Sequence, residues 1–225
     1  MAFQPVAELD LIKVIVFDCD GVMFDSKHAN ETFYNHILAH FGRPPMTSEE
    51  IEFVHQNTGL ESVAHIFRAY PEKAAALEFL QTFSFEPFLP LMKIEPGLID
   101  FLKFLRPTYH TAIATNRSYT MPGLLRAAGM TEYFDLVITC LDVSRPKPYP
   151  DELMRILEYF DVAANQILYF GDSKVDELTA NRVGVPLIAY KNNKLDAFMH
   201  VSDFDRVKQF LTGERSIKYR VMASG

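Results

Sequence analysis

Cysteine is scarce in this sequence, which has only Cys19 and Cys140 among 225 residues. Two cysteines are too few for a disulfide framework, and neither lies in a closely spaced metal-binding pair such as C-x-x-C. These counts exclude a small scaffold held together by disulfides. A reducing cytoplasm is the simplest location for such a chain.

An excess of positive charge is also missing. The chain has 22 Lys and Arg against 29 Asp and Glu, a net charge of −7, and it has no long basic run. We therefore expect no nucleic-acid or membrane-surface partner, and a small-molecule substrate instead. The N-terminal residues lack the pattern of a secretory signal, and no segment approaches the roughly 18 apolar residues of a membrane span.

The segment Lys13–Ser26, KVIVFDCDGVMFDS, organises the rest of the chain. Its apolar run Val14–Phe17 predicts a strand that is buried on both faces. Gly21 permits a sharp turn after this strand, which leaves Asp18 and Asp20 at the strand's carboxyl end. The sequence thus delivers two acids to one edge of a sheet.

The block from residue 27 to about residue 91 has apolar residues at helical spacing and no convincing strand pattern. Thr47 and Glu50 have the spacing of a capping box, which predicts the start of a helix. We expect a further helix over 60–70. Another helix is predicted to begin at Pro71, because proline suits the first turn of a helix.

From about residue 94 the pattern alternates between strands and helices. The expected strands are 111–115, 134–139, 167–170 and 186–190, and the expected helices are 97–105, 121–128, 151–160, 175–183 and one within 197–211. Such alternation predicts an α/β fold with a parallel sheet covered on both faces. We expect a doubly wound core formed by 1–24 and 92–225, with a helical cap domain, 25–91, inserted into it.

Functional side chains gather at the carboxyl ends of the strands in a doubly wound sheet. The polar residues that follow the expected strands are Asp18, Asp20, Thr115, Asn116, Lys147, Asp172 and Asp176. This combination of acids, one cation and one hydroxyl suits phosphoryl transfer through an aspartate. Asp18 and Asp172 offer oxygen ligands to Mg²⁺, and Asp176 joins them directly or through water.

The other residues of this set have complementary roles in the same chemistry. The Thr115 hydroxyl suits binding of phosphoryl oxygens, and Lys147 suits charge neutralisation there. Asp20 suits protonation of the leaving oxygen and then deprotonation of the attacking water. Taken singly, Thr115 fits a helix cap and Lys147 a solvated lysine. Arg117 fits a substrate contact and a surface position equally well.

Four segments of the chain resemble, in order and spacing, the motifs of the haloacid dehalogenase-like hydrolases. They are Asp18-Cys19-Asp20-Gly21-Val22, Thr115-Asn116, Lys147 and Gly171-Asp172-Ser173-Lys174-Val175-Asp176. The resemblance implies a Rossmann-like core, Mg²⁺, the first aspartate as nucleophile and the second as acid/base. We expect Asp18, Asp20, Thr115 and Lys147 to be the catalytic residues. The expected metal site is Asp18, Asp20, Asp172 and Asp176, and the expected substrate-binding residues are Thr115, Asn116, Arg117 and Lys147.

The helical insertion is similar to the cap of the phosphoglycolate phosphatase and β-phosphoglucomutase branch of that family. Dehalogenases lack an acid at the position of Asp20, so this residue favours a phosphatase or a phosphomutase. β-Phosphoglucomutases place a cap histidine twelve residues after the nucleophile, where this chain has Asn30, although His28 is near. This departure favours the phosphatase.

We therefore predict a Mg²⁺-dependent phosphatase, similar to phosphoglycolate phosphatase, that hydrolyses a small phosphorylated metabolite through a phospho-aspartate. A monomer or a homodimer is expected. The alternatives are a sugar phosphomutase and a non-catalytic module that binds a phosphorylated ligand. Substrate choice is expected to lie with the cap, where the loop 57–59 and Arg43 are the candidate contacts.

Overall fold

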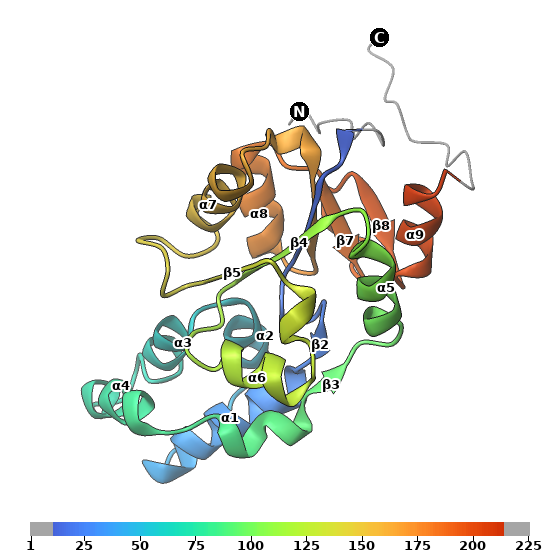
Figure 1. The fold of residues 1–225 in the computed structure, drawn as a ribbon. Helices are drawn as coiled ribbons and strands as arrows, with labels where there is room; N and C mark the ends of the chain where they lie inside the picture. The colour runs from blue at the N-terminus through green and yellow to red at the C-terminus, as the bar shows by residue number, and fades with distance from the viewer. Residues whose placement is uncertain (1–10, 214–225) are drawn as a thin grey trace.

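A six-stranded parallel sheet forms the centre of the computed structural model, which describes residues 11–213 (Figure 1). Residues 1–10 and 214–225, which belong to the predicted core, lie outside the described residues. The strands are β1 (Val14–Phe17), β4 (His110–Thr115), β5 (Leu136–Thr139), β6 (Ile167–Gly171), β7 (Leu187–Tyr190) and β8 (Met199–Val201). Their order, β5-β4-β1-β6-β7-β8, confirms the predicted doubly wound α/β fold.

Helices cover both faces of the sheet, as Figure 1 shows. They are α5 (Leu98–Leu105), α6 (Met121–Ala127), α7 (Asp151–Phe160), α8 (Lys174–Val183) and α9 (Asp205–Leu211), with short 3₁₀ turns at Thr131–Tyr133 and Ala164–Gln166. Val14 and Val16 of β1 pack in one cluster with α7 and α8, whereas Phe17 packs in the other with α5 and α9. Alternate β1 side chains thus fix the strand between two apolar layers.

The cap helices lie between β1 and β4 in the sequence and together at one end of the sheet in space (Figure 1). They are α1 (Lys27–His40), α2 (Ser48–Gln56), α3 (Gly59–Ile66), α4 (Lys73–Thr82) and the 3₁₀ segment η2 (Glu86–Leu91). The short strands β2 (Phe24–Asp25) and β3 (Lys93–Ile94) pair antiparallel where the chain enters and leaves these helices. The predicted division at 25–91 stays a prediction, and this pairing supports it.

Two of the cap helices, α2 and α3, begin at threonines whose side chains satisfy free backbone groups. Thr47 and Glu50 form the predicted capping box at α2, and Thr58 and Glu61 form a second one at α3. In each box the threonine oxygen accepts a hydrogen bond from the backbone N–H of the glutamate. The glutamate carboxylate accepts one from the backbone N–H of the threonine. Because α2 ends at Gln56 and α3 begins at Gly59, the second box lies at the break between the two helices.

Two local predictions were wrong, and the short strands β2, β3 and β8 were not predicted. The helix expected over 60–70 ends at Ile66, and the next helix begins at Lys73 instead of Pro71. The first helical bond of α4 runs from Ala76 N–H to Glu72 O, which makes Glu72 the N-cap and leaves Pro71 in the preceding turn. Strand β8 has only three residues, too few for a recognisable alternation.

None of the helices among residues 11–213 is long and apolar enough to cross a bilayer.

Candidate active site

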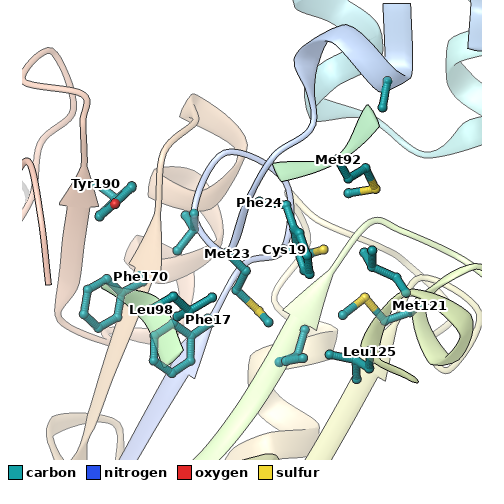
Figure 2. Packing of buried hydrophobic residues seen from close by; sticks show 14 of the residues in the cluster. Phe17, Cys19, Met23, Phe24, Met92, Leu98, Met121, Leu125, Phe170 and Tyr190 are labelled. Atoms are coloured by element: carbon teal, nitrogen blue, oxygen red, sulfur yellow. The ribbon is translucent and has the colours of Figure 1, made fainter. Parts of the chain in front are cut away.

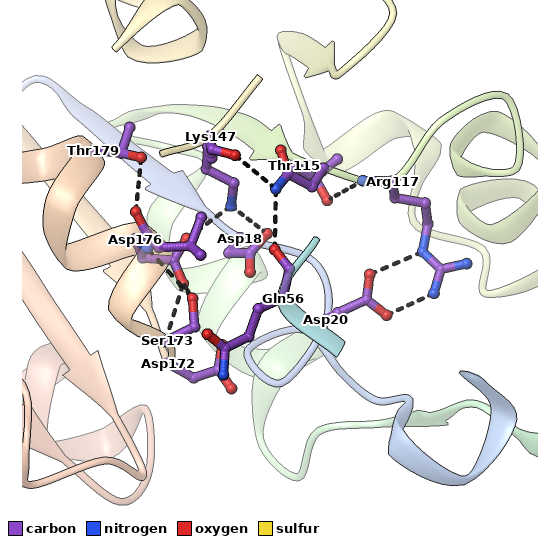
Figure 3. Close-up of polar contacts among 12 residues, drawn as sticks. Asp18, Asp20, Gln56, Thr115, Arg117, Lys147, Asp172, Ser173, Asp176 and Thr179 are labelled. Carbon is purple, nitrogen blue, oxygen red and sulfur yellow. Dashed lines mark hydrogen bonds and ion pairs between the residues drawn. The ribbon is translucent and has the colours of Figure 1, made fainter. Parts of the chain in front are cut away.

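The polar residues predicted at the strand ends meet at one edge of the sheet (Figure 3). Gly21 allows this convergence, because its φ of +82° suits glycine and because a Cβ there would lie 2.1 Å from Asp172 Oδ2. Gly171 at the end of β6 has the same function, since a Cβ would lie 2.3 Å from Asp176 Cβ. Glycine at these two positions lets the turn after β1 and the start of α8 approach closely.

Three carboxylates form an acidic cluster at this edge. Asp18, Asp172 and Asp176 each offer an oxygen, and these atoms lie within 4.8 Å of one another. Burial and the neighbouring carboxylates raise the pKa of Asp18 to about 7, although Lys147 opposes the rise. The same causes raise the pKa of Asp172 well above its usual range. This concentration of hard oxygen ligands and excess negative charge fits a divalent cation.

Lys147 is the buried cation of the cluster, with 2% of its surface exposed. Its ammonium contacts Asp18 Oδ1 at 2.8 Å, Asp176 Oδ1 at 2.7 Å and the Tyr169 hydroxyl at 2.9 Å. An ammonium has three N–H donors, so each of them has a partner. Burial alone would lower the pKa of Lys147, but the two carboxylates raise it well above its usual range. Lys147 therefore remains charged and holds Asp18 in place.

Asp176 is fully buried, and both of its carboxylate oxygens are saturated with hydrogen bonds. Oδ1 accepts from Lys147 and from the Tyr169 hydroxyl at 2.6 Å. Oδ2 accepts from the Ser173 backbone N–H at 3.1 Å and from its hydroxyl at 2.5 Å, as part of the capping box of α8. These bonds and Lys147 outweigh burial and lower the pKa of Asp176.

Asp20 lies outside the acidic cluster and pairs with Arg117 (Figure 3). Arg117 Nη2 donates to Asp20 Oδ1 at 2.6 Å, and Nε donates to Oδ2 at 3.1 Å. Asn30 of α1 donates to the same Oδ1 at 3.3 Å. Burial would raise the pKa of Asp20, but Arg117 outweighs it and lowers the pKa to about 2. Arg117 is therefore not an exposed surface residue. It lies buried against Asp20 and lines the cavity, and its contact with substrate stays a prediction.

Thr115 and Asn116 connect the end of β4 to its surroundings. The Thr115 hydroxyl accepts from the Arg117 backbone N–H at 3.1 Å. The Asn116 amide donates to the Gln56 carbonyl of α2 at 3.0 Å and to the Lys147 carbonyl at 3.1 Å. Asn116 therefore joins three parts of the site, namely β4, the cap helices and the loop that carries Lys147.

The cap helices supply residues that the sequence patterns did not single out. His55 Nε2 of α2 lies 3.8 Å from Asp172 Oδ2, and Asn30 touches both Asp20 and Arg117. Tyr169 of β6 was also missed, because an aromatic residue in a buried strand is typical of a core. Asn30 was considered only as the replacement of a histidine. The signal that could have found it was its position on the first cap helix, close in sequence to Asp20.

A cavity of about 480 Å³ opens between the cap helices and the sheet edge. Asp18, Asp20, Thr115 and Lys147 line its inner end. The loop 57–59 also lines it, which agrees with the position expected for that loop. Arg43 does not line it: its guanidinium pairs with Glu72 at 2.5 Å and lies over the Tyr70 ring.

Cys19 lies between the two aspartates of the first motif, and its side chain points into the apolar core (Figure 2). Its surface is completely buried, among residues that include Met23 and Phe24. Burial and the nearby Asp20 raise the pKa of the thiol well above its usual range, so the unreactive thiol form prevails. Cys19 therefore serves as a small packing residue beneath the site.

Comparison with known proteins gives one consistent result. The model of a family described as haloacid dehalogenase-like hydrolase matches residues 15–190. A phosphoglycolate phosphatase from Rhodobacter capsulatus is 30% identical over 210 residues, which cover 84% of this chain and 91% of that protein.

Solved structures give the same result. A HAD-superfamily hydrolase of subfamily IA from Geobacter sulfurreducens is 34% identical, with a TM-score of 0.74 over 89% of this chain and 97% of that one. CbbY from Rhodobacter sphaeroides, solved in complex with phosphate, has a TM-score of 0.75 over 87% of this chain and 96% of its own. At 23% identity, CbbY shows the likeness of the fold alone.

Proposed function

The chain belongs to the haloacid dehalogenase-like hydrolases and is a phosphatase, and from that premise we propose that it hydrolyses a small phosphate monoester with Mg²⁺ through a phospho-aspartate on Asp18. The observation that carries this proposal is the placement of Asp18. Its carboxylate lies beside Lys147, within the acidic cluster, at the inner end of the cavity. The proposed nucleophile Asp18, the cation Lys147 and the acidic cluster thus lie next to one another.

Asp18 and Asp172 would hold the Mg²⁺, and Asp176 takes part directly or through water. Bound Mg²⁺ offsets the repulsion between an anionic nucleophile and a phosphate, and it polarises the phosphoryl group. Because both Asp176 oxygens already have partners, participation through water leaves its bonds to Lys147 and Ser173 intact. Asp20, the fourth predicted ligand, has its carboxylate on Arg117, so coordination by that side chain competes with the ion pair.

Asp18 attacks the phosphorus, and the bond to the leaving oxygen breaks. Asp20 gives a proton to that oxygen. Because Arg117 keeps its carboxylate ionised, Asp20 must first take up a proton from solvent and exchange one of its two bonds to Arg117 for the substrate. Asp20 then accepts a proton from the water that attacks the phospho-aspartate. The ion pair with Arg117 favours the ionised carboxylate that this second step needs.

Thr115 and Lys147 act on the phosphoryl group and on the nucleophile. The Thr115 hydroxyl lines the cavity near Asp18 and suits a hydrogen bond to a phosphoryl oxygen. Lys147 neutralises the charge of Asp18 and fixes its direction. Asn116 holds the loop of Lys147 and the end of α2 at the site, so its contribution to substrate binding is positional.

Replacement of the nucleophile tests this function. Asp18→Asn keeps the size of the side chain, so the fold survives while turnover of 4-nitrophenyl phosphate with Mg²⁺ falls to background. Asp100→Asn is the matched control, because the Asp100 side chain is 88% exposed and far from the cluster in sequence. Retained turnover in Asp18→Asn would contradict the proposed mechanism.

The two alternatives have their own signatures. A sugar phosphomutase would form an isomer in the presence of a bisphosphate primer without releasing inorganic phosphate. A binding module would show ligand-dependent stabilisation and no turnover across a broad panel of phosphate esters. Asp20 at the cavity favours catalysis over binding alone, because simple phosphate binding does not need a second acid there.

A further inference from the structure

We propose that the substrate is a phosphate monoester with no anionic group other than its phosphate. Its leaving alcohol is neutral and presents more apolar surface than a two-carbon acid does. This inference rests on the proposed phosphatase function and concerns the outer part of the same cavity. Three features carry it: the pairing of Arg117 and Lys147, the large apolar side chains in the lining, and the size of the space.

The cationic side chains of the cavity are already engaged. Among the described residues that line it, only His55, Arg117 and Lys147 are basic. Lys147 has a partner for each of its three donors, two of them carboxylates. His55 Nε2 lies 3.8 Å from Asp172 Oδ2, and its Nδ1 is buried without a hydrogen-bond partner, where a ligand cannot reach it. Neither of these side chains is available to a carboxylate or second phosphate on the leaving group.

The Arg117 side chain makes more hydrogen bonds than that of Lys147 or His55. Its side chain is 6% exposed, and beyond its two bonds to Asp20 it donates to Thr120 Oγ1 at 3.3 Å and Asn30 Oδ1 at 3.4 Å. Its guanidinium also lies over the Phe85 ring, 4.8 Å from the centroid. A substrate anion would have to break a buried ion pair before it could use this cation, which opposes binding of a second anionic group.

Large apolar and aromatic side chains make up much of the cavity lining, beside polar ones such as Gln81 and Ser144. They include Phe33, Tyr34, Leu60, Phe85, Tyr119 and Leu141. Leu60 and Tyr119 are each 55% exposed and Leu141 is 64% exposed, so three large apolar side chains face water beside the site. A ligand that covers them gains from burial of their apolar surface, whereas a bare two-carbon acid reaches little of it.

The volume agrees with this assignment. A cavity of about 480 Å³ lies within the range of roughly 300–1,000 Å³ that is typical of pockets enclosing drug-sized ligands. A phosphoryl group attacked by Asp18 would fill only the end near Asp18 and Thr115. The remaining space, between the cap helices and the segment that follows β4, is open to the body of the alcohol.

Two matched pairs of esters test the inference. The first pair is benzyl phosphate and the same molecule with a carboxylate on the ring; the second is 2-hydroxyethyl phosphate and phosphoglycolate. We expect kcat/KM of the Mg²⁺-loaded enzyme to favour the neutral member of each pair by roughly tenfold or more. Benzyl phosphate should also exceed 2-hydroxyethyl phosphate. If a substrate carboxylate instead took over Arg117 and released Asp20, both pairs would rank in the opposite order.

A charge added to the wall makes the test specific to this cavity. Leu60→Lys should reduce the preference for benzyl phosphate over its carboxylated partner severalfold, whereas Met154→Lys should leave it unchanged. Met154 is a fitting control, because it is 54% exposed on α7 and does not line the cavity. An unchanged preference in Leu60→Lys would contradict the assignment to this wall.

The outcomes separate the two proposals. Equal or faster hydrolysis of the carboxylated member in either pair would overturn the inference and leave the phosphatase function standing. No hydrolysis of any of the four esters by the folded, Mg²⁺-loaded protein would overturn the phosphatase function itself, and the inference with it.

Discussion

Arg117 grips Asp20 through two parallel hydrogen bonds, 2.6 Å from Nη2 to Oδ1 and 3.1 Å from Nε to Oδ2 (Figure 3). The pair joins the segment after β4 to the turn after β1, with 6% and 14% of the two side chains exposed. Such a fork-to-fork contact fixes direction as well as charge. Arg117 therefore determines where the proposed acid/base of the reaction points.

Loss of Arg117 should destabilise the fold strongly. Arg117→Met leaves Asp20 buried without its counter-charge, which costs about 3–5 kcal/mol of unfolding free energy. Arg145→Met removes an exposed ion pair with Asp151 and should cost at most about 1 kcal/mol. Urea unfolding of the two variants measures the difference. Similar losses would mean that the Arg117 pair contributes no more than a surface pair.

Gly21 should be required for the geometry of the site. Gly21→Ala places a Cβ 2.1 Å from Asp172 Oδ2, so Asp172 must move and turnover should fall roughly a hundredfold. Gly42→Ala is the control: its φ is +66°, but no heavy atom lies within 4 Å of the added Cβ. It should lose about 1–2 kcal/mol of stability from the left-handed backbone and keep its turnover. Equal turnover of both variants would contradict the close approach at Gly21.

The sequence predicted the sheet and the strand-end residues well, because both follow from local patterns. Apolar runs, turn glycines and the spacing of Asp18, Thr115, Lys147 and Asp172 are legible along the chain, and the family resemblance drawn from them is confirmed. The contacts that these residues make could not be predicted in the same way. The Arg117–Asp20 pair spans 97 positions, so no local pattern contains it.

The contacts between the cap and the core could not be predicted from the sequence either. His55 meets Asp172, and Gln56 meets Asn116, only because α2 packs over the sheet edge. Their sequence neighbourhood shows an ordinary amphipathic helix. Arg43 was a plausible substrate contact by charge alone, yet Glu72 and Tyr70 hold it on the cap. Tertiary packing decided each of these cases.

Glu152 should make stability depend on pH. It is completely buried on α7, and burial raises its pKa to about 8, although Lys147 opposes the rise. Between its ordinary pKa of 4.5 and about 8, the unfolded chain releases a proton that the folded chain keeps. The contribution of Glu152 to stability is therefore most favourable below pH 4.5 and is lost progressively up to about pH 8.

Replacement of the Glu152 carboxyl should remove this loss of stability at high pH. Glu152→Gln should exceed the wild type in unfolding free energy at pH 8, by on the order of 1–3 kcal/mol, and the advantage should shrink toward pH 5. Urea unfolding at a series of pH values measures it. An advantage that is constant with pH would show that packing, and not ionisation, causes the difference.

Removal of the metal should abolish turnover and reveal the acidic cluster as its site. EDTA should stop hydrolysis, and added Mg²⁺ should restore it. Mg²⁺ at about 100 times its dissociation constant should stabilise the fold by about 2.7 kcal/mol. Thermal unfolding should show this gain in the wild type and in Asp100→Asn, and a much smaller one in Asp172→Asn. An equal gain in all three would place the metal elsewhere.

The phospho-aspartate is the central claim, and a rapid-quench experiment tests it directly. Protein mixed with excess benzyl phosphate and Mg²⁺, quenched in acid within one turnover, is digested and analysed by mass spectrometry. The account predicts that the peptide containing Asp18 gains the mass of one phosphoryl group, with none on the same peptide from Asp18→Asn. Turnover with no phosphoryl group on Asp18 at any time, or with the group on another residue, would contradict it.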